Sequence, residues 1–402
     1  PGSNGGITPP VITAIGDEVH GTAPASSVVE VFGDDAAQGE LYLGTALASI
    51  DGLWNISLNL SNLVGKNLTA IATDTNGNSS EFSLPVAIGG EGEGSAEGEG
   101  ASEGENGLTV TTNADSGAGS LREALTTANA GAGNVDIYFS LPEDQRLITV
   151  LSALPALAEP NIRIHGGGVV TVQWEGVQGD MAGLLVESSG CLIEGLAIMG
   201  FRCNIHITGH DNVVIGCLLG RSFTGALGNT SSFGVKIEGD ANRIGGAAAG
   251  EQNIIVNAGA GGILVQGTES SPAIENMIYG NLIQVIGAGI GAEYASFLSI
   301  GGTEPGMGNV LIGSLRGVYL GPCDNVMVKG NFIGLDALGA PQPNTQAGIF
   351  IRGACADSII GGDSPEAGNI IAYNNHGIVF DNEMPQRIVM RHNSIHHNIG
   401  RG

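Results

Sequence analysis

Apolar and polar positions in the second half of the chain recur at a fixed interval. The phrase Ile-Gly-Gly begins at Ile244, Ile300 and Ile360, so the repeat unit is 56–60 residues long. An asparagine before an apolar pair follows each phrase, and a glycine before a β-branched residue comes next; these positions are Asn253, Asn309 and Asn369, then Gly262, Gly317 and Gly377. Self-similarity at a fixed period predicts a solenoid, and this unit is long enough for about two coils.

The apolar runs are short and rich in β-branched residues. From Ile148 onward each run ends at a turn after a few residues, as in residues 162–166 and 212–216. Parallel strands that are stacked coil upon coil and buried on one face have this sequence pattern. We therefore predict an all-β chain in which residues 107–402 form a parallel β-helix. The repeated asparagines and glycines are interpreted as structural turn residues, because an amide can bond the backbone along the stack.

A helical pattern interrupts the β texture near the start of this region. After a strand at residues 108–112, apolar residues recur at helical spacing, which predicts a short amphipathic helix. Its first residues fit a capping box and are Ser120, Leu121, Arg122, Glu123 and Ala124. We expect this helix to close the first coil, within a capping segment at residues 107–140, and Arg122 to form an orienting ion pair with Asp115.

The run from Val110 to Ala124 resembles a segment known from bacterial extracellular and surface proteins. There, a Ser-Leu-Arg-Glu-Ala sequence caps right-handed parallel β-helices of the pectin-lyase-like type. Gly119 stands where that family often has cysteine, but the helical pattern is intact. The resemblance implies a right-handed solenoid and a location outside the cell or at its surface.

Residues 1–88 have the pattern of a separate β-sandwich. Short apolar strands alternate with turn signals, and we expect strands at residues 28–32, 41–43, 54–58 and 68–72. The stretches 21–24, 51–54 and 73–80 together resemble immunoglobulin-like modules of bacterial surface proteins. Trp54 is expected in the core of this sandwich.

One turn of the sandwich has oxygen-bearing side chains. Asp74, Asn76 and Asn78 offer the ligand type that Ca²⁺ prefers, and a hairpin turn explains the same residues equally well. A Ca²⁺ site is therefore an alternative to a simple turn at these residues, and no other cofactor is expected.

Residues 89–106 form a linker of glycine and glutamate between the two regions. This stretch holds six Glu and no apolar side chain larger than alanine, so it predicts a flexible, self-repelling spacer. The whole chain has a net charge of −26, which argues against nucleic acid and anionic membranes as partners. The sequence stops within a repeat, so we expect a β-helix that is truncated at its C-terminal end.

Five cysteines, at positions 191, 203, 217, 323 and 355, show no metal-binding spacing. We expect small buried residues stacked within the solenoid. One disulfide between neighbouring coils remains an alternative at this point.

Candidate catalytic residues are few. Asp180, Asp211 and Asp240 are spaced by 31 and 29 residues, so they are candidates for one face of the rod, with His210 beside them. Such carboxylates would suit a polysaccharide hydrolase, but turn positions explain them as well. Lys236 is interpreted as one outward position of the repeat, matching Val265, Leu320, Ile351 and Val379 or their neighbours. The histidines at 392, 396 and 397 are an alternative metal cluster.

The combined pattern favours a non-enzymatic extracellular protein with a structural or adhesive role, in a filament or a cell-surface layer. Its expected partners are a glycan or protein on a surface, or copies of itself, without direct insertion into a membrane. A carbohydrate-active β-helix enzyme, either a hydrolase or a lyase, is the alternative.

Overall fold

The computed structural model describes most of the chain in two compact units, Pro1–Gly104 and Glu105–Gly402. The predicted linker at residues 89–106 lies outside the described residues. The described residues are 7–15, 18–34, 41–50, 52–58, 66–75, 77–83, 86–87, 107–131, 134–175, 181–248, 250–381 and 386–400.

The first unit contains two antiparallel sheets, as expected for an immunoglobulin-like sandwich. One sheet has the order β1-β2-β5 and the other β4-β3-β6-β7; the strands are β1 (Val11–Ile15), β2 (Glu18–Thr22), β3 (Val28–Asp34), β4 (Leu41–Leu47), β5 (Leu53–Ser57), β6 (Asn67–Thr73) and β7 (Val86–Ala87). Trp54 is buried in the core with Val19, Val29 and Leu68. The two strands before residue 23 did not feature among the sequence predictions.

The second unit begins with the predicted cap. Strand β8 (Gly107–Val110) is followed by helix α1 (Leu121–Ala130), which buries Leu121, Ala124, Leu125 and Ala128. Ser120 Oγ accepts the Glu123 N–H at 3.2 Å, and the Glu123 carboxylate accepts the Gly119 N–H at 2.5 Å. The capping box therefore reaches one residue further back than the standard form. Arg122 pairs with Asp115 at 2.7 Å and also donates to the carbonyl of Ser152, which ties the helix to the first coils.

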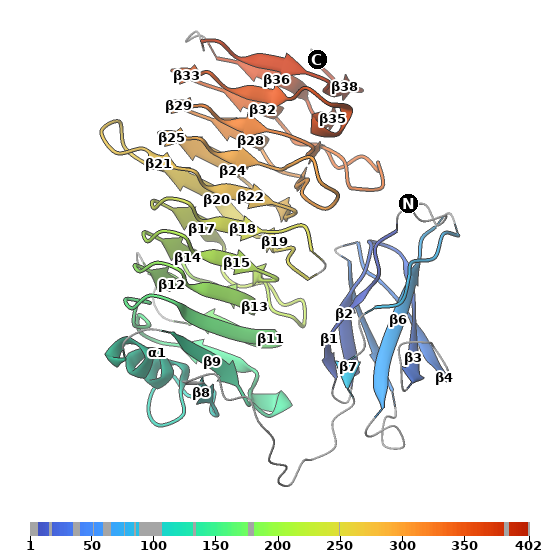
Figure 1. Ribbon diagram of the computed structural model, residues 1–402, viewed down its shortest axis with the longest axis vertical. Helices are drawn as coiled ribbons and strands as arrows, with labels where there is room; N and C mark the ends of the chain where they lie inside the picture. The colour runs from blue at the N-terminus through green and yellow to red at the C-terminus, as the bar shows by residue number, and fades with distance from the viewer. Residues whose placement is uncertain are drawn as a thin grey trace, which may run out of the picture. The chain divides into compact units, whose positions relative to one another are not determined.

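Beyond the cap, the chain winds into about ten coils of parallel strands (Figure 1). The first strands are β9 (Val135–Phe139), β10 (Leu147–Val150) and β11 (Ile162–Trp174), and two short 3₁₀ turns lie at Glu143–Gln145 and Pro365–Ala367. A 19-stranded sheet joins β8 to β11 with β13 (Leu192–Met199), β15 (Val213–Ile215), β16 (Leu218–Leu219), β18 (Arg243–Gly245), β19 (Ile254–Val256), β22 (Met277–Tyr279), β23 (Leu282–Gln284), β26 (Ser299–Ile300), β27 (Val310–Ile312), β30 (Met327–Val328), β31 (Phe332–Ile333), β34 (Ile359–Gly361), β35 (Ile370–Ala372), β37 (Val389–Arg391) and β38 (Ser394–His396).

Two further sheets contribute to the coils, one to eight of them and the other to four. An eight-stranded sheet contains β12 (Ala182–Val186), β14 (Cys203–Ile207), β17 (Ser231–Ile237), β20 (Ala258–Gln266), β24 (Ala288–Glu293), β28 (Arg316–Leu320), β32 (Ala347–Ile351) and β36 (His376–Phe380). A four-stranded corner sheet contains β21 (Ala273–Ile274), β25 (Ala295–Ser296), β29 (Cys323–Asp324) and β33 (Cys355–Ala356). The coils thus enclose one continuous apolar core.

Buried asparagines connect the coils at their turns in three ladders. Within each ladder the amide of one asparagine donates to the Oδ1 of the asparagine in the next coil, at 2.8–3.1 Å. The ladders consist of Asn253, Asn281, Asn309, Asn331, Asn369 and Asn393; of Asn212, Asn242 and Asn276; and of Asn344, Asn374 and Asn398. Because backbone groups at turns lack strand partners, these amides satisfy donors and acceptors that would otherwise be buried unpaired.

The repeated glycines of the eight-stranded sheet lie where two coils approach most closely. A Cβ on each would lie 2.6–2.8 Å from the carbonyl oxygen of the glycine in the next coil, along the row Gly234, Gly262, Gly289, Gly317 and Gly348, the last of which faces Gly377. That distance is too short for any side chain, so glycine is required at this position for steric reasons.

Candidate functional site

The outer face of the eight-stranded sheet presents one side chain per coil in register. This outer row runs through Leu185, His206, Lys236, Leu264, Gly291, Tyr319, Phe350 and Val379. Lys236 is thus in register with Leu264, Tyr319 and Phe350. The sequence-based alignment allowed Val265, Leu320 and Ile351 or their neighbours, and the structure selects the neighbours, since Val265, Leu320 and Ile351 themselves are buried in the core. The alignment with Val379 agrees with the register.

An arginine lies over two aromatic rings of this row. The guanidinium of Arg316 lies 4.3 Å from the ring centre of Phe350 and 5.2 Å from that of Tyr319. The two rings are nearly parallel, with centres 6.3 Å apart. The Gln346 side chain accepts a hydrogen bond from Arg316 Nε at 2.6 Å and fixes the guanidinium over the rings. Burial and the nearby Glu293 carboxylate raise the pKa of the Tyr319 hydroxyl, which therefore stays protonated.

A charged cluster occupies the same sheet three coils earlier. Glu238 accepts hydrogen bonds from Lys236 at 2.6 Å and contacts His206 Nε2 at 2.9 Å. Burial alone would raise the pKa of Glu238, but these two partners outweigh it and the pKa is lowered. Because its carboxylate is ionised and each of its oxygens has a partner, Glu238 does not act as a proton donor.

A second histidine links two carboxylates on the 19-stranded sheet. His165 Nε2 lies 2.7 Å from Asp136 and its Nδ1 lies 2.6 Å from Glu194, and the ring of Tyr138 stacks on it. Arg163 bonds both oxygens of Asp136 at 2.8 Å and lowers the pKa of that carboxyl to about 2. Burial opposes protonation of His165, but the bonds to Glu194 and Asp136 prevail and raise its pKa.

Replacing His165 by asparagine should therefore destabilise the β-helix in a pH-dependent way. The folded protein holds the imidazole proton more tightly than the unfolded chain, so the contribution is fully present below about pH 6.5 and is lost as the pH rises through the raised pKa. Thermal midpoints of both proteins, measured across this range, should converge at high pH. A difference that does not change with pH would show that His165 acts only by packing.

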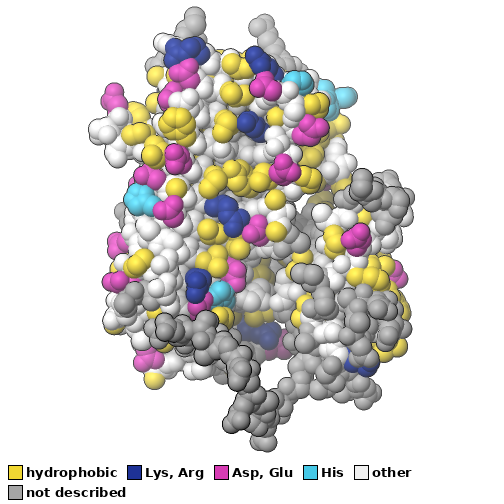
Figure 2. Space-filling view, viewed as in Figure 1, with side chains coloured by type: hydrophobic (Ala, Val, Ile, Leu, Met, Phe, Trp, Pro, Cys, Tyr) yellow, Lys and Arg dark blue, Asp and Glu magenta, His cyan; other side chains and the backbone are white. Residues whose placement is uncertain are grey.

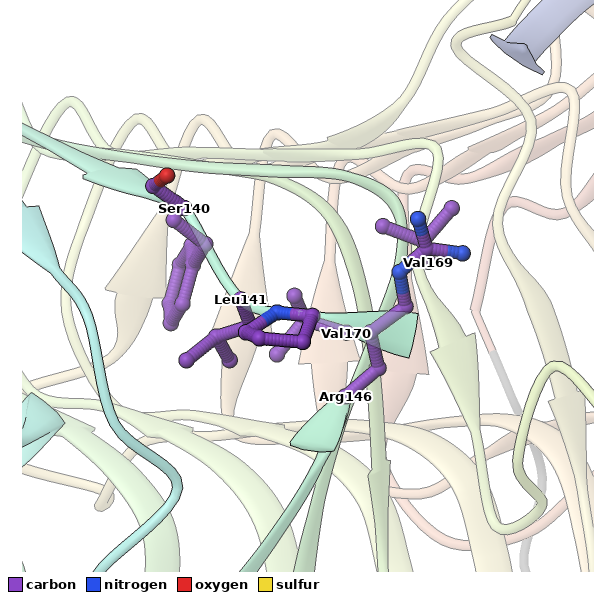
Figure 3. Close-up of a pocket in the computed structure, with 7 residues that line it drawn as sticks. Ser140, Leu141, Arg146, Val169 and Val170 are labelled. Carbon is purple, nitrogen blue, oxygen red and sulfur yellow. The ribbon is translucent and has the colours of Figure 1, made fainter. Parts of the chain in front are cut away.

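A cavity of about 330 Å³ lies near the cap, between the end of β9 and strand β11. Figure 3 shows Arg146 on one side of this space and Leu141 on the other. The remaining lining is Phe139, Ser140, Pro142, Val169 and Val170. Since Arg146 is the only ionisable residue among these, the lining contains no acid–base pair.

Two members of the predicted carboxylate trio, Asp211 and Asp240, are not in register. Asp240 occupies the turn position that His210 holds in the preceding coil. There the Asp240 N–H donates to His210 Nδ1 at 3.0 Å. The coil here is 30 residues long, as the pairing of Val213 with Arg243 shows, so the spacing of 29 residues places Asp211 one position away from Asp240. Asp240 Oδ1 accepts the Ile274 N–H at 2.9 Å, which is a turn contact between coils. Asp180 lies outside the described residues.

The candidate metal ligands have other partners. Both carboxylate oxygens of Asp74 accept hydrogen bonds from Asn78, at 2.8 and 3.0 Å, as in a tight turn, and Asn76 lies outside the described residues. His392 Nδ1 lies 2.7 Å from the carbonyl of Gly362, away from the contact between His396 and His397. Calcium binding by the turn stays a prediction.

Several ladder residues escaped the sequence reasoning although a signal was present. Asn212, Asn242 and Asn276 each precede two residues of a buried strand, as Asn253 does. Asn281 and Asn331 lie in the coils between the repeated phrases. The cluster around Arg316 had no such signal, since Tyr319 and Phe350 are brought together only by the coil register.

Surface charge on the coils is mixed. Figure 2 shows basic, acidic and apolar side chains interspersed over the visible face of the β-helix. Several described bases of the β-helix have acidic partners, such as Arg352 with Asp381 and Arg387 with Asp357. Within the part of the chain that the structure describes, no helix is both long and apolar enough to cross a membrane.

Comparison with known families gives two matches. Residues 7–87 match the bacterial Ig domain family, and residues 229–399 match the family described as periplasmic copper-binding protein (NosD). No curated protein matches the sequence.

Two solved structures with low TM-scores resemble the chain. One is an alginate lyase from Paenibacillus sp. str. FPU-7, 15% identical over 71% of this chain and 99% of that one, with a TM-score of 0.33. The other is a pectate lyase from Pectobacterium carotovorum, 10% identical over 94% of this chain and 91% of that one, with a TM-score of 0.20. From the family matches and its own strand pairing, the chain is a bacterial immunoglobulin-like domain followed by a parallel β-helix that matches the NosD family over residues 229–399.

Proposed function

We propose that this protein is a non-enzymatic binding scaffold of the bacterial cell surface, and that the outer face of its eight-stranded sheet holds an extended glycan. The observation that carries the proposal is the stack of Arg316, Tyr319 and Phe350 within a row of in-register side chains. Neighbouring coils are spaced by about 4.8 Å, so a ligand that lies along the axis meets an equivalent position at every coil.

The chemistry of the stack suits a sugar ring. Phe350 is only 9% exposed because Arg316 covers it, so the guanidinium and Tyr319 form the accessible surface. A flat guanidinium offers several donors to hydroxyl oxygens, while Tyr319 offers an aromatic face and a hydroxyl. The net charge of −26 disfavours polyanions, so neutral glycans are the preferred class.

The proposed location outside the cytoplasm is supported by both family matches, one to a bacterial Ig domain and one to a family described as periplasmic. The name of the second family also raises the question of whether this protein binds copper. The described residues include no group of three or more His, Cys, Asp or Glu side chains placed to hold a metal ion. The donor set therefore does not fit copper, and we assign no role to it.

Substituting the stack should weaken glycan binding without unfolding the protein. We expect Arg316→Ala and Tyr319→Ala each to weaken binding about tenfold or more, because a central arginine or tyrosine carries much of the energy of such contacts. The matched control is Arg391→Ala, an exposed arginine in β37 of the 19-stranded sheet, away from this row. Binding is measured by calorimetry against neutral and uronic-acid polysaccharides.

The same polysaccharides test the enzymatic alternative. Incubation with the protein, with and without Ca²⁺, should release no oligosaccharides. Release of oligosaccharides would contradict the scaffold role, and unchanged binding by the Arg316 and Tyr319 variants would contradict the assigned face.

A further inference from the structure

Two cysteines face each other across neighbouring coils of the corner sheet. Cys323 in β29 is in register with Cys355 in β33, and the same row continues through Ala295 and Ala273 in the preceding coils. All four side chains are buried. The row is thus made of small residues, which leaves room for contact between its side chains.

The sulfur atoms of this pair are in direct contact. Their Sγ atoms lie 2.7 Å apart, although both thiols are unbonded in the structure. In-register residues of parallel strands are separated by about 4.8 Å, which lies within the range of about 4.4–6.8 Å between the Cα atoms of a disulfide. The backbone therefore needs no movement for the bond to form.

The other three cysteines have different surroundings. Cys203 and Cys217 lie within hydrogen-bond distance of the carbonyls of Ile205 and Ile215, at 3.1 and 3.3 Å, and Cys191 lies 3.3 Å from Ser188 Oγ. Burial raises the pKa of Cys203 and Cys217 to about 12, so these thiols are unreactive.

We propose that Cys323 and Cys355 form a disulfide that staples two neighbouring coils of the β-helix. The proposal rests on the location outside the cytoplasm, where disulfides form and persist. The oxidant is a disulfide, either of a small molecule or of a protein. The hydrogen bond that Cys323 donates lowers the pKa of the Cys355 thiol, so Cys355 attacks the oxidant as a thiolate and forms a mixed disulfide with release of one thiol. Cys323 then attacks the Cys355 sulfur and releases the second thiol, so two cysteine thiols and one disulfide give one cystine and two thiols.

The staple would close a ring that contains one whole coil, since the two cysteines are 32 residues apart in sequence. Strands β30, β31 and β32 lie inside this ring. A bond of this kind limits the freedom of the unfolded chain and raises the thermal midpoint of the coils it joins by about 5 °C or more.

The test is a thiol count on the full chain. The protein is treated with oxidised glutathione, denatured without reductant and labelled with a maleimide. Five cysteines minus one pair should leave three labelled thiols. Peptide mapping of the unreduced protein should show residues 323 and 355 cross-linked.

Three labelled thiols together with that cross-link support the disulfide. Five labelled thiols, or a cross-link between a different pair, overturn it. Both the thiol count and the peptide map are obtained on the protein without any substitution. The variant Cys323→Ser/Cys355→Ser should lose the effect of reductant on the thermal midpoint, whereas Cys217→Ser should keep it. Because the thiol count does not depend on glycan binding, its failure is distinct from a failure of the proposed function.

Discussion

Replacing Asn331 by alanine will lower the free energy of unfolding of the β-helix by about 3–5 kcal/mol, since several buried polar groups lose their partners at once. The Asn331 amide donates to the carbonyls of Ile300 and Lys329 and to Asn369 Oδ1, at 2.9–3.0 Å. Its own Oδ1 accepts both the backbone N–H and the side-chain amide of Asn309, at 3.0 and 2.9 Å. No water can replace these bonds, because Asn331 is only 1% exposed.

The control for this substitution is Asn375→Ala. Asn375 is half-buried, yet its side chain makes no hydrogen bond to another described residue. Urea unfolding followed by circular dichroism should show a large shift for the Asn331 variant and a change within about 0.5 kcal/mol for the control. Similar shifts in both variants would mean that the ladder hydrogen bonds add no more to the free energy of unfolding than a polar side chain at any turn.

Replacing Gly262 by alanine should be the second severe change. The new Cβ would lie 2.4 Å from Ile283 Cγ2 and 2.6 Å from the carbonyl oxygen of Gly289. The carbonyl belongs to the strand of the next coil, so relief requires that two coils separate and their hydrogen bonds weaken. We expect a loss of about 2–3 kcal/mol, in the range found for overpacked cores.

Strand β20 supplies the matched control within the same nine residues. At Gly259 the nearest atoms to an added Cβ are 3.6 Å away, an ordinary contact distance. Gly259→Ala should therefore leave the thermal midpoint almost unchanged or raise it slightly, because alanine restricts the unfolded chain. If both variants melt alike, the close approach of the coils at Gly262 is not the reason for the repeated glycine.

The sequence pattern predicted repeated coils but not the exact number of residues in each coil. Strict repetition of Asn253, Asn309 and Asn369 predicted a structural row, and the structure places all three in one ladder. The intervening Asn281 and Asn331 were not assigned to this row, because the turns differ in length and successive ladder residues are 22 to 38 positions apart.

The register between strands of neighbouring coils decides which side chains share a surface. An error of one residue in that register assigns different side chains to it. The interval between Asp211 and Asp240 suggested a shared face, but the local coil is one residue longer than that interval. Contacts such as that between Arg316 and Phe350 join positions 34 residues apart, and no local pattern encodes them.

The asparagine ladders also bear on how such a chain can change its size. Each ladder asparagine donates its amide to the asparagine of one neighbouring coil and accepts an amide from the other. A coil such as residues 282–309 therefore lies between two asparagines, Asn281 and Asn309, that bond in the same way. Duplication or loss of one such unit would let the remaining asparagines bond one another in the same way. The reach of the molecule is thus set by the number of units inherited, and lengthening it requires no new core design.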